Sequence, residues 1–219
     1  MFSTAIKDTF NFFKTHWLML ALISVPLVLL SEAIKYSVGP VGASGASLGD
    51  LWFYFGEIVF VFSLLQVSVI LYIHAAVNGP SLGVMQSWRL GFSWLLPYLG
   101  LSLLTLLPVA LGLLLFIIPG IIVMVRLMLA PYIFLLENLG AKASLMASWE
   151  RTKGHFGDLV MGGIVIMLPI TIISRLVASS QEMMTSSIKV AAVASIETFF
   201  GLILSVYLYR IYSLIKAKQ

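Results

Sequence analysis

The side chains of this chain that could do chemistry are a few charged residues inside long apolar runs. Glu57, Arg126 and Glu197 each interrupt a run long enough to cross a membrane. An ionisable group at the centre of a membrane helix costs about 2.5–3.5 kcal/mol or more, so it indicates a functional site unless a partner relieves the cost. One interpretation is that the three residues form an intramembrane polar site for an ion, a proton or a lipid headgroup. The competing interpretation is a structural Arg–Glu ion pair that sets the helix register.

Five further basic residues flank the apolar runs and are candidate contacts to lipid headgroups. A basic side chain near an anionic membrane surface contributes about 1 kcal/mol of binding. This placement favours membrane lipids as partners and gives no indication of nucleic-acid binding, although the formal net charge is +4. The five are Lys14, Arg89, Lys142, Arg151 and Lys153.

Catalytic and metal-binding motifs are missing from the sequence. It contains no HExxH, GxSxG, Walker or GxGxxG pattern. It has no cysteine, which excludes disulfides, a thiol nucleophile and cysteine metal ligands. His16 and His155 precede apolar runs, and no second pair of ligands at helical spacing accompanies them, so we interpret them as interfacial anchors. We therefore predict a non-enzymatic protein with no catalytic residue, no cofactor and no metal.

Two polar residues near the ends of apolar runs have simpler interpretations. His74 is expected to bond to the backbone at the membrane interface. Glu137 is expected to pair with Lys142 or Arg151, which follow it closely in the sequence.

The elements that must position these residues are membrane-spanning helices. Hydrophobic residues make up 60% of the 219 residues and charged residues 10%, against about 45–50% and about 25% in soluble domains. Several apolar runs exceed the roughly 20 residues that cross a bilayer core. We predict an all-α integral membrane protein with Gly/Ser-rich Gly39 to Gly49 as a loop and Ser179 to Lys189 as a polar connection. The predicted spans are about 17–36, 51–77, 95–117, 119–137, 157–179 and 190–213.

The chain can be aligned with itself as three pseudo-repeats in one transmembrane domain, residues 1–219. When Phe10, Trp88 and Trp149 are superposed, Lys14 matches Lys153 and His16 matches His155. In each repeat a cytoplasmic, interfacial amphipathic helix precedes an outward and a returning span. The repeats cover about 1–78, 79–138 and 139–219.

Proline and glycine predict local features of the spans. Pro108 and Pro131 are expected to kink the third and fourth spans, because proline removes a helical hydrogen bond. Pro119 and Gly120 are expected to turn the chain between these spans. In the fifth span, small residues indicate a surface suited to close helix packing. They are Gly157, Gly162 and Gly163.

Lysine and arginine predict the orientation, because basic residues concentrate in cytoplasmic loops. With both termini inside, the cytoplasmic side carries nine of them and the outer side three, which favours termini in the cytoplasm. The inner set is Lys7, Lys14, Arg89, Lys142, Arg151, Lys153, Arg210, Lys216 and Lys218, and the outer set is Lys35, Arg175 and Lys189.

Three stretches carry a resemblance to a known family: IPGIIVMVRLMLAPYIFLLENLGAKASLMASW, DTFNFFKTHW and YLYRIYSLIKAKQ. Together they resemble the YciC family of bacterial inner-membrane proteins. The chain is more distantly similar to the membrane domain that accompanies some glycerophosphodiester phosphodiesterases. The resemblance implies a multi-pass protein of the bacterial cytoplasmic (inner) membrane with no catalytic residues to transfer. The soluble barrel of the phosphodiesterases has no counterpart in these residues, so that activity is not expected.

Two functions remain open from the sequence. The first is a non-enzymatic role in envelope or lipid homeostasis through contacts with lipids, a membrane-protein partner or a second copy of the chain. The alternative is a small transporter or lipid flippase that uses Glu57, Arg126 and Glu197, which the proline-interrupted spans and the repeat favour.

Overall fold

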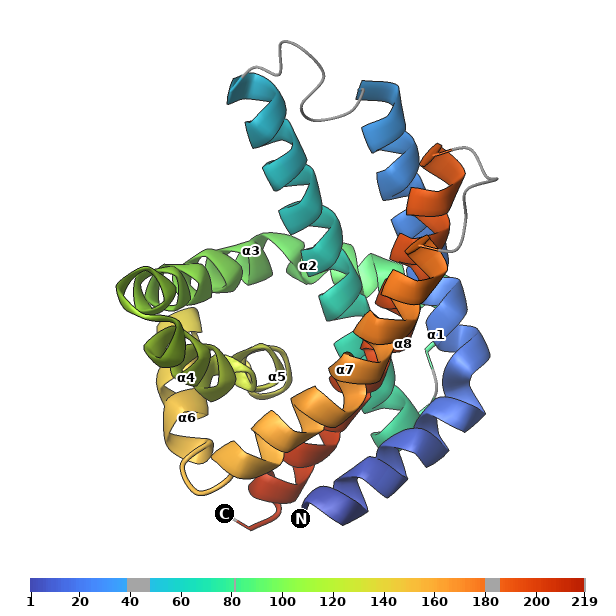
Figure 1. Ribbon diagram of the computed structural model, residues 1–219. Helices are drawn as coiled ribbons and strands as arrows, with labels where there is room; N and C mark the ends of the chain where they lie inside the picture. Colours follow the sequence, from blue (N-terminus) through green and yellow to red (C-terminus); the bar gives the residue numbers. More distant parts are fainter. Residues whose placement is uncertain (39–47, 81, 180–185, 219) are drawn as a thin grey trace.

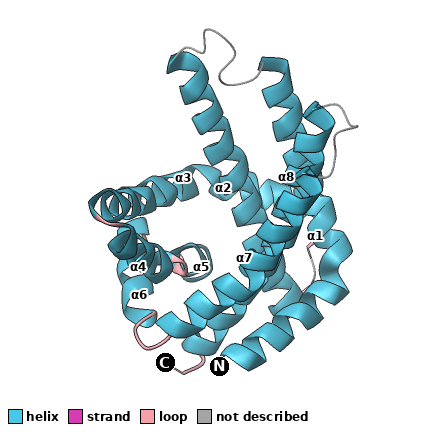
Figure 2. Cartoon of the chain, in the orientation of Figure 1, coloured by secondary structure: helices cyan, strands magenta, loops and turns pink. Residues whose placement is uncertain are grey.

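The computed structural model describes residues 1–38, 48–80, 82–179 and 186–218, and within these ranges the chain is built from helices without strands (Figures 1 and 2). The predicted loop from Gly39 to Gly49 and the polar stretch from Ser179 to Lys189 lie mainly outside the described residues. The helices are α1 (Phe2–Val38), α2 (Leu48–Asn78), α3 (Val84–Leu115), α4 (Ile117–Leu127), α5 (Ala130–Glu137), α6 (Ala141–Arg151), α7 (Phe156–Ser179) and α8 (Ser186–Lys216).

Six stretches of these helices are long and apolar enough to cross a membrane, as the sequence predicts. Helices are expected there, because a backbone in hydrocarbon must satisfy its own hydrogen bonds. The fourth span is made of two helices, α4 and α5, in one continuous apolar stretch. The six stretches are Phe2–Ser37, Phe55–Asn78, Val84–Leu115, Ile117–Glu137, Phe156–Leu176 and Ala191–Lys216.

The bundle is organised around α8. Figure 1 shows α1 and α7 beside α8, and the two ends of the chain at the same end of the molecule. Asp8 and Arg210 pair there at 2.9 Å, which joins the first helix to the last. Fully buried large side chains of α2 and α8, such as Tyr72 and Tyr207, fill the centre. Close packing of this kind holds membrane bundles together, since lipid tails are as apolar as the side chains themselves.

The amphipathic segments that we predicted before the first two spans are not separate helices. Helix α1 runs without interruption from Phe2 to Val38, and it bends along its length in Figure 1, as expected for a helix that contains Pro26. Helix α3 likewise continues from the Trp88 segment into its span. Only α6 is separate, because the chain reverses through Gly154, whose φ of 81° is a left-handed conformation that glycine adopts at little cost.

The hairpin between α3 and α4 turns earlier than predicted. The turn is at Phe116, which is extended (φ −159°, ψ 146°), and Pro119 is the third residue of α4. Proline is tolerated there, because backbone N–H groups in the first turn of a helix have no intrahelical partner. Gly112 and Gly120 let the two helices meet closely: a Cβ on Gly112 would lie 2.8 Å from the Gly120 Cα.

Proline has different effects in the third and fourth spans. The prediction for Pro131 is confirmed, since α4 ends at Leu127 and α5 restarts with Pro131 in its first turn. Pro108 lies inside α3, which continues as one helix past it.

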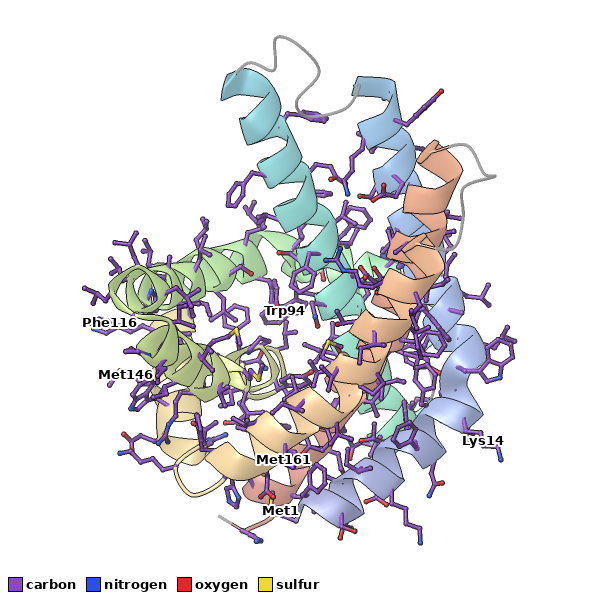
Figure 3. All side chains as sticks on the ribbon, in the orientation of Figure 1. Met1, Lys14, Trp94, Phe116, Met146 and Met161 are labelled. Carbon is purple, nitrogen blue, oxygen red and sulfur yellow. The ribbon has the colours of Figure 1, made fainter. Side chains whose placement is uncertain are left out.

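The outer surface of the α3–α4 hairpin is strongly apolar. Leu114 is 85% exposed and Phe116, labelled at the outer edge in Figure 3, is 73% exposed. Side chains this apolar would promote aggregation in water. In contact with lipid tails these side chains are not exposed to water, which is consistent with a hairpin that faces lipid.

Candidate functional site

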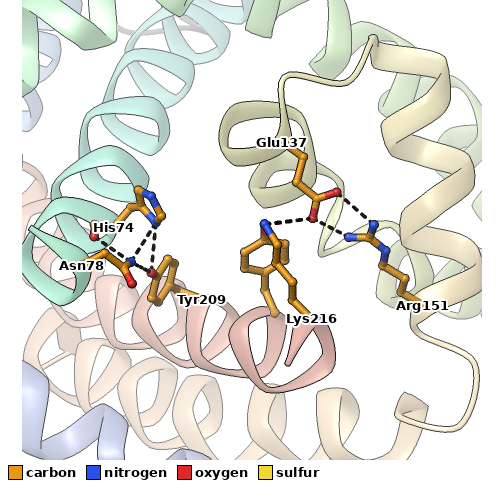
Figure 4. Close-up of polar contacts among 7 residues, drawn as sticks. His74, Asn78, Glu137, Arg151, Tyr209 and Lys216 are labelled. Carbon is orange, nitrogen blue, oxygen red and sulfur yellow. Dashed lines mark hydrogen bonds and ion pairs between the residues drawn. The ribbon is translucent and has the colours of Figure 1, made fainter. Parts of the chain in front are cut away.

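A polar network lies at the end of the bundle that carries both termini (Figure 4). Glu137, the last residue of α5, accepts two hydrogen bonds from the Arg151 guanidinium, at 2.6 and 2.9 Å. The Tyr212 hydroxyl donates to the Glu137 Oε1 at 2.9 Å, and the Lys216 ammonium lies 3.8 Å from the same atom. The prediction that Glu137 pairs with Arg151 is confirmed.

This network links α5, α6 and α8 through side-chain hydrogen bonds and ion pairs. The hydrogen bonds from Arg151 to Glu137 raise the pKa of Arg151 above its ordinary value, so the guanidinium remains positively charged. The side chains of Glu137 and Arg151 are 14% and 18% exposed, so the pair is largely shielded from water. A carboxylate with this many donors is poorly suited to act as a general base. Its role is structural: it joins α8 to the consecutive helices α5 and α6.

A second group of polar side chains joins α2 to α8 at the same end (Figure 4). The Asn78 amide donates to the Tyr209 hydroxyl at 2.8 Å, and the His74 Nδ1 lies 3.1 Å from that hydroxyl. We expected His74 to bond to the backbone, and the structure places it against side chains instead. The sequence did not predict the tyrosines of α8 as polar partners of other helices, although the pattern YLYRIY places several of them close together.

Arg126 lies against α6 rather than against a glutamate. Its guanidinium carbon is 5.6 Å from the centre of the Trp149 ring and 5.9 Å from that of Phe156. Its backbone carbonyl accepts a hydrogen bond of 2.7 Å from the Ser148 hydroxyl. Among the described residues Arg126 forms no ion pair, so the expected Arg–Glu pair is not observed. Because α4 ends at Leu127, Arg126 lies in the last turn of that helix. This turn packs against α6.

We expect Arg126→Ala to lower the free energy of unfolding by about 1–2 kcal/mol, because it removes cation–π contacts to two rings. Unfolding in mixed detergent micelles measures this change. Native mass spectrometry of the same variant should show an unchanged set of bound lipids. A specific lipid that disappears with Arg126→Ala would instead make the residue a binding group.

The two glutamates of the predicted polar site have separate surroundings. Glu57 is 7% exposed, and it forms an ion pair with Lys35, whose ammonium lies 3.8 Å from its Oε2. Glu197, on α8, accepts a hydrogen bond of 2.5 Å from the Ser174 hydroxyl of α7. Glu57, Arg126 and Glu197 therefore have three different sets of partners.

The five candidate headgroup contacts divide into two classes. Arg151 is held by Glu137, and Lys153 pairs with Glu150 at 2.6 Å. The other three are exposed and, within the part of the chain that the structure describes, have no acidic partner. They are Lys14, Arg89 and Lys142. Figure 3 shows Lys14 pointing away from the bundle.

An apolar cavity of about 390 Å³ lies among α2, α3, α4 and α5. This volume is within the roughly 300–1,000 Å³ of small-molecule pockets. One buried polar atom in its wall, the Ser63 Oγ, has no hydrogen-bond partner. The wall is formed by Phe55, Val59, Phe62, Ser63, Tyr98, Leu101, Ser102, Leu103, Thr105, Leu106, Val109, Met124, Leu127, Met128 and Pro131.

A second cavity, of about 520 Å³, lies among α1, α2 and α3 and contains Glu57. Its other walls are apolar, and within the described part of the chain both Glu57 oxygens are buried without a hydrogen-bond partner. Among the described residues there is no group of three or more histidine or acidic side chains that could hold a metal ion.

The comparisons with known proteins agree with a membrane protein. The model of the "Uncharacterised protein family (UPF0259)" matches residues 55–214. A UPF0259 membrane protein of Sodalis glossinidius is 26% identical over 246 residues, covering 99% of this chain and 98% of its own. One from Photorhabdus laumondii is 25% identical over 248 residues, covering 99% and 96%. No solved structure matches. With most of its length matched by the family model, the chain belongs to the UPF0259 family of membrane proteins.

Proposed function

We propose that this protein is a non-enzymatic component of the bacterial inner membrane that acts in envelope or lipid homeostasis by holding a membrane lipid. The observation that carries the proposal is the apolar cavity among α2, α3, α4 and α5. The remaining parts of the proposal are the three pseudo-repeats, the cytoplasmic termini and the likeness to the YciC family. The distribution of lysine and arginine supports the cytoplasmic termini, and the alignment of Phe10, Trp88 and Trp149 supports the repeats. The similarity to bacterial membrane proteins supports the family likeness.

The chemistry of the cavity suits an acyl chain. Its walls are aliphatic and aromatic, and two wall residues, Leu103 and Leu106, are themselves 52% and 45% exposed. The cavity therefore opens onto the apolar outer surface, where a lipid tail would enter sideways from the bilayer. A tail gains little by leaving hydrocarbon for another apolar wall, so binding depends on shape and on hydrogen bonds. The unpartnered Ser63 hydroxyl is available for one such bond.

Exposed basic residues also support the proposed binding of a lipid. Lys14, Arg89 and Lys142 lack acidic partners in the described structure, so their charges are free to meet phosphate groups at the membrane surface. Each adds about 1 kcal/mol near anionic lipids. All three residues belong to the side of the membrane that we predict to be cytoplasmic.

Native mass spectrometry of protein extracted in mild detergent tests the lipid proposal. We expect Ser102→Phe to reduce the amount of co-purified lipid severalfold, because the added ring would fill the cavity. Leu104→Phe is the matched control, since Leu104 lies on the same helix, is 44% exposed and is not part of the cavity wall. Equal lipid content in wild type and Ser102→Phe would refute the proposal. A bound protein or second copy in the same spectra would favour a protein partner instead.

A small transporter or lipid flippase is the second candidate. The observation that favours it is the buried Glu57 carboxylate, which faces a cavity without a hydrogen-bond partner. Arg126 and Glu197 are engaged elsewhere, so this candidate now depends on Glu57.

A further inference from the structure

The cavity that contains Glu57 combines one carboxylate with apolar walls. The Glu57 side chain is 7% exposed, and among the described residues neither carboxylate oxygen has a hydrogen-bond donor. A buried carboxylate is costly unless it is paired, and the ammonium of Lys35 is 3.8 Å away. That ammonium also donates a shorter bond, 2.9 Å, to Glu32. The carboxylate is therefore only partly compensated by protein groups.

The local charge favours a cationic ligand. Among the described residues that form ion pairs here, Glu32 and Glu57 are acidic and Lys35 is basic, so acidic groups outnumber basic ones by one. A phospholipid amine would bring its phosphate close to this negative cluster. A free cation would not suffer this repulsion.

The walls of the cavity favour an apolar body on that cation. Phe53, Phe60 and Phe92 come from two helices, and aromatic faces attract cations in apolar surroundings. The remaining wall is aliphatic and comes from α1 and α2, with Leu27 and Leu64 among its residues. The volume of about 520 Å³ is sufficient for a ligand with several rings or a branched apolar body.

We propose that this cavity is a binding site for a free amphiphilic monocation, an ammonium-type or similar charge carried on an apolar body, with Glu57 as its counter-ion. This site is on the opposite side of α2 from the acyl-chain cavity and shares no wall residue with it. The inference therefore does not depend on the proposed lipid function. Ser102→Phe, which fills the other cavity, should leave it unchanged.

Equilibrium dialysis of the full-length purified protein in maltoside detergent tests the inference, with protein-free micelles as the blank. The probe is tetraphenylphosphonium, and tetraphenylborate is the control ligand of the same shape and opposite charge. We expect saturable binding of the phosphonium alone. Glu57→Gln should weaken it by about tenfold or more, because the counter-charge is lost. Glu197→Gln removes a carboxylate elsewhere and should leave binding intact.

A second variant separates loss of the site from loss of the fold. A side chain on Gly56 would project into open space, and Gly56 lines the cavity, so Gly56→Leu should block binding while Glu57 remains. Gly100→Leu is the matched control, since Gly100 also has open space and lies outside the cavity. All variants should elute as wild type in size-exclusion chromatography. Absence of saturable phosphonium binding, equal binding of the borate, or unchanged binding in both Glu57→Gln and Gly56→Leu would overturn the inference.

Discussion

Glu137→Gln is expected to lower the free energy of unfolding by about 3 kcal/mol, the cost of breaking a buried ion pair. The substitution leaves Arg151 mostly buried without its counter-charge, weakens the hydrogen bond from Tyr212 and removes the ion pair with Lys216. Because the network joins α5, α6 and α8, its loss should loosen the end of the bundle that carries both termini. Unfolding in mixed dodecyl sulfate and maltoside micelles measures the effect.

An exposed ion pair at the C-terminal end of α6 provides the control for this experiment. Glu150 and Lys153 form an ion pair with side chains that are 64% and 56% exposed. Exposed pairs contribute about 0–1 kcal/mol, so Glu150→Gln should have little effect. In a double variant, Glu137→Gln with Arg151→Met, the loss should be smaller than the sum of the two single losses, because neither charge remains unpaired. If Glu137→Gln and Glu150→Gln change the free energy of unfolding equally, the network around Glu137 does not stabilise the bundle.

The second large effect is expected at the contact between α7 and α8. A Cβ on Gly162 would overlap the Tyr207 ring, which is fully buried. The ring has little freedom to move, since its hydroxyl also donates a 2.6 Å hydrogen bond to the Asp158 carbonyl. Gly162→Ala should therefore cost about 1–3 kcal/mol, as overpacking does in well-packed cores. Thermal unfolding in detergent measures the change.

Neighbouring glycines of α7 provide matched controls. A Cβ on Gly157 or Gly163 would have no neighbour within 4 Å. Gly163→Ala should be neutral or slightly stabilising, because alanine favours helix by up to about 1 kcal/mol. Adding Tyr207→Leu to Gly162→Ala should recover part of the loss by removing the ring. If Gly162→Ala and Gly163→Ala behave alike, the close contact between α7 and α8 is not a source of stability. Of the three glycines predicted to form a packing surface, only Gly162 has this close contact.

Some features could be predicted because they depend on neighbouring residues in the sequence. The membrane class and the six spans follow from the length of the apolar runs and the scarcity of charge. The break at Pro131 follows from a missing N–H group, and the pairing of Glu137 with Arg151 from charges that flank one short connection.

Other features could not be predicted, because they depend on which helices become neighbours. Periodicity indicates which residues share a face of a helix, but it does not identify the helix that this face contacts. Arg126 was expected near Glu57 and Glu197, and the packing of α6 on α4 placed it against Trp149 instead. The same limit explains why the tyrosines of α8 were missed: Tyr209 meets Asn78, which is 131 positions away in the sequence.

The sequence by itself determined that this is a membrane protein with six helices long and apolar enough to cross a bilayer, since apolar length and local charge decide whether a segment enters a bilayer. Tertiary structure alone decided which buried charges are compensated. Glu137 accepts hydrogen bonds from Arg151 and Tyr212 and lies 3.8 Å from the Lys216 ammonium, whereas Glu57 lines an apolar cavity and has only the Lys35 ammonium, also at 3.8 Å, as a partner among the described residues. The two glutamates have the same chemistry in the sequence. The physical difference is the number of partner groups on other helices, which is established only when the bundle packs.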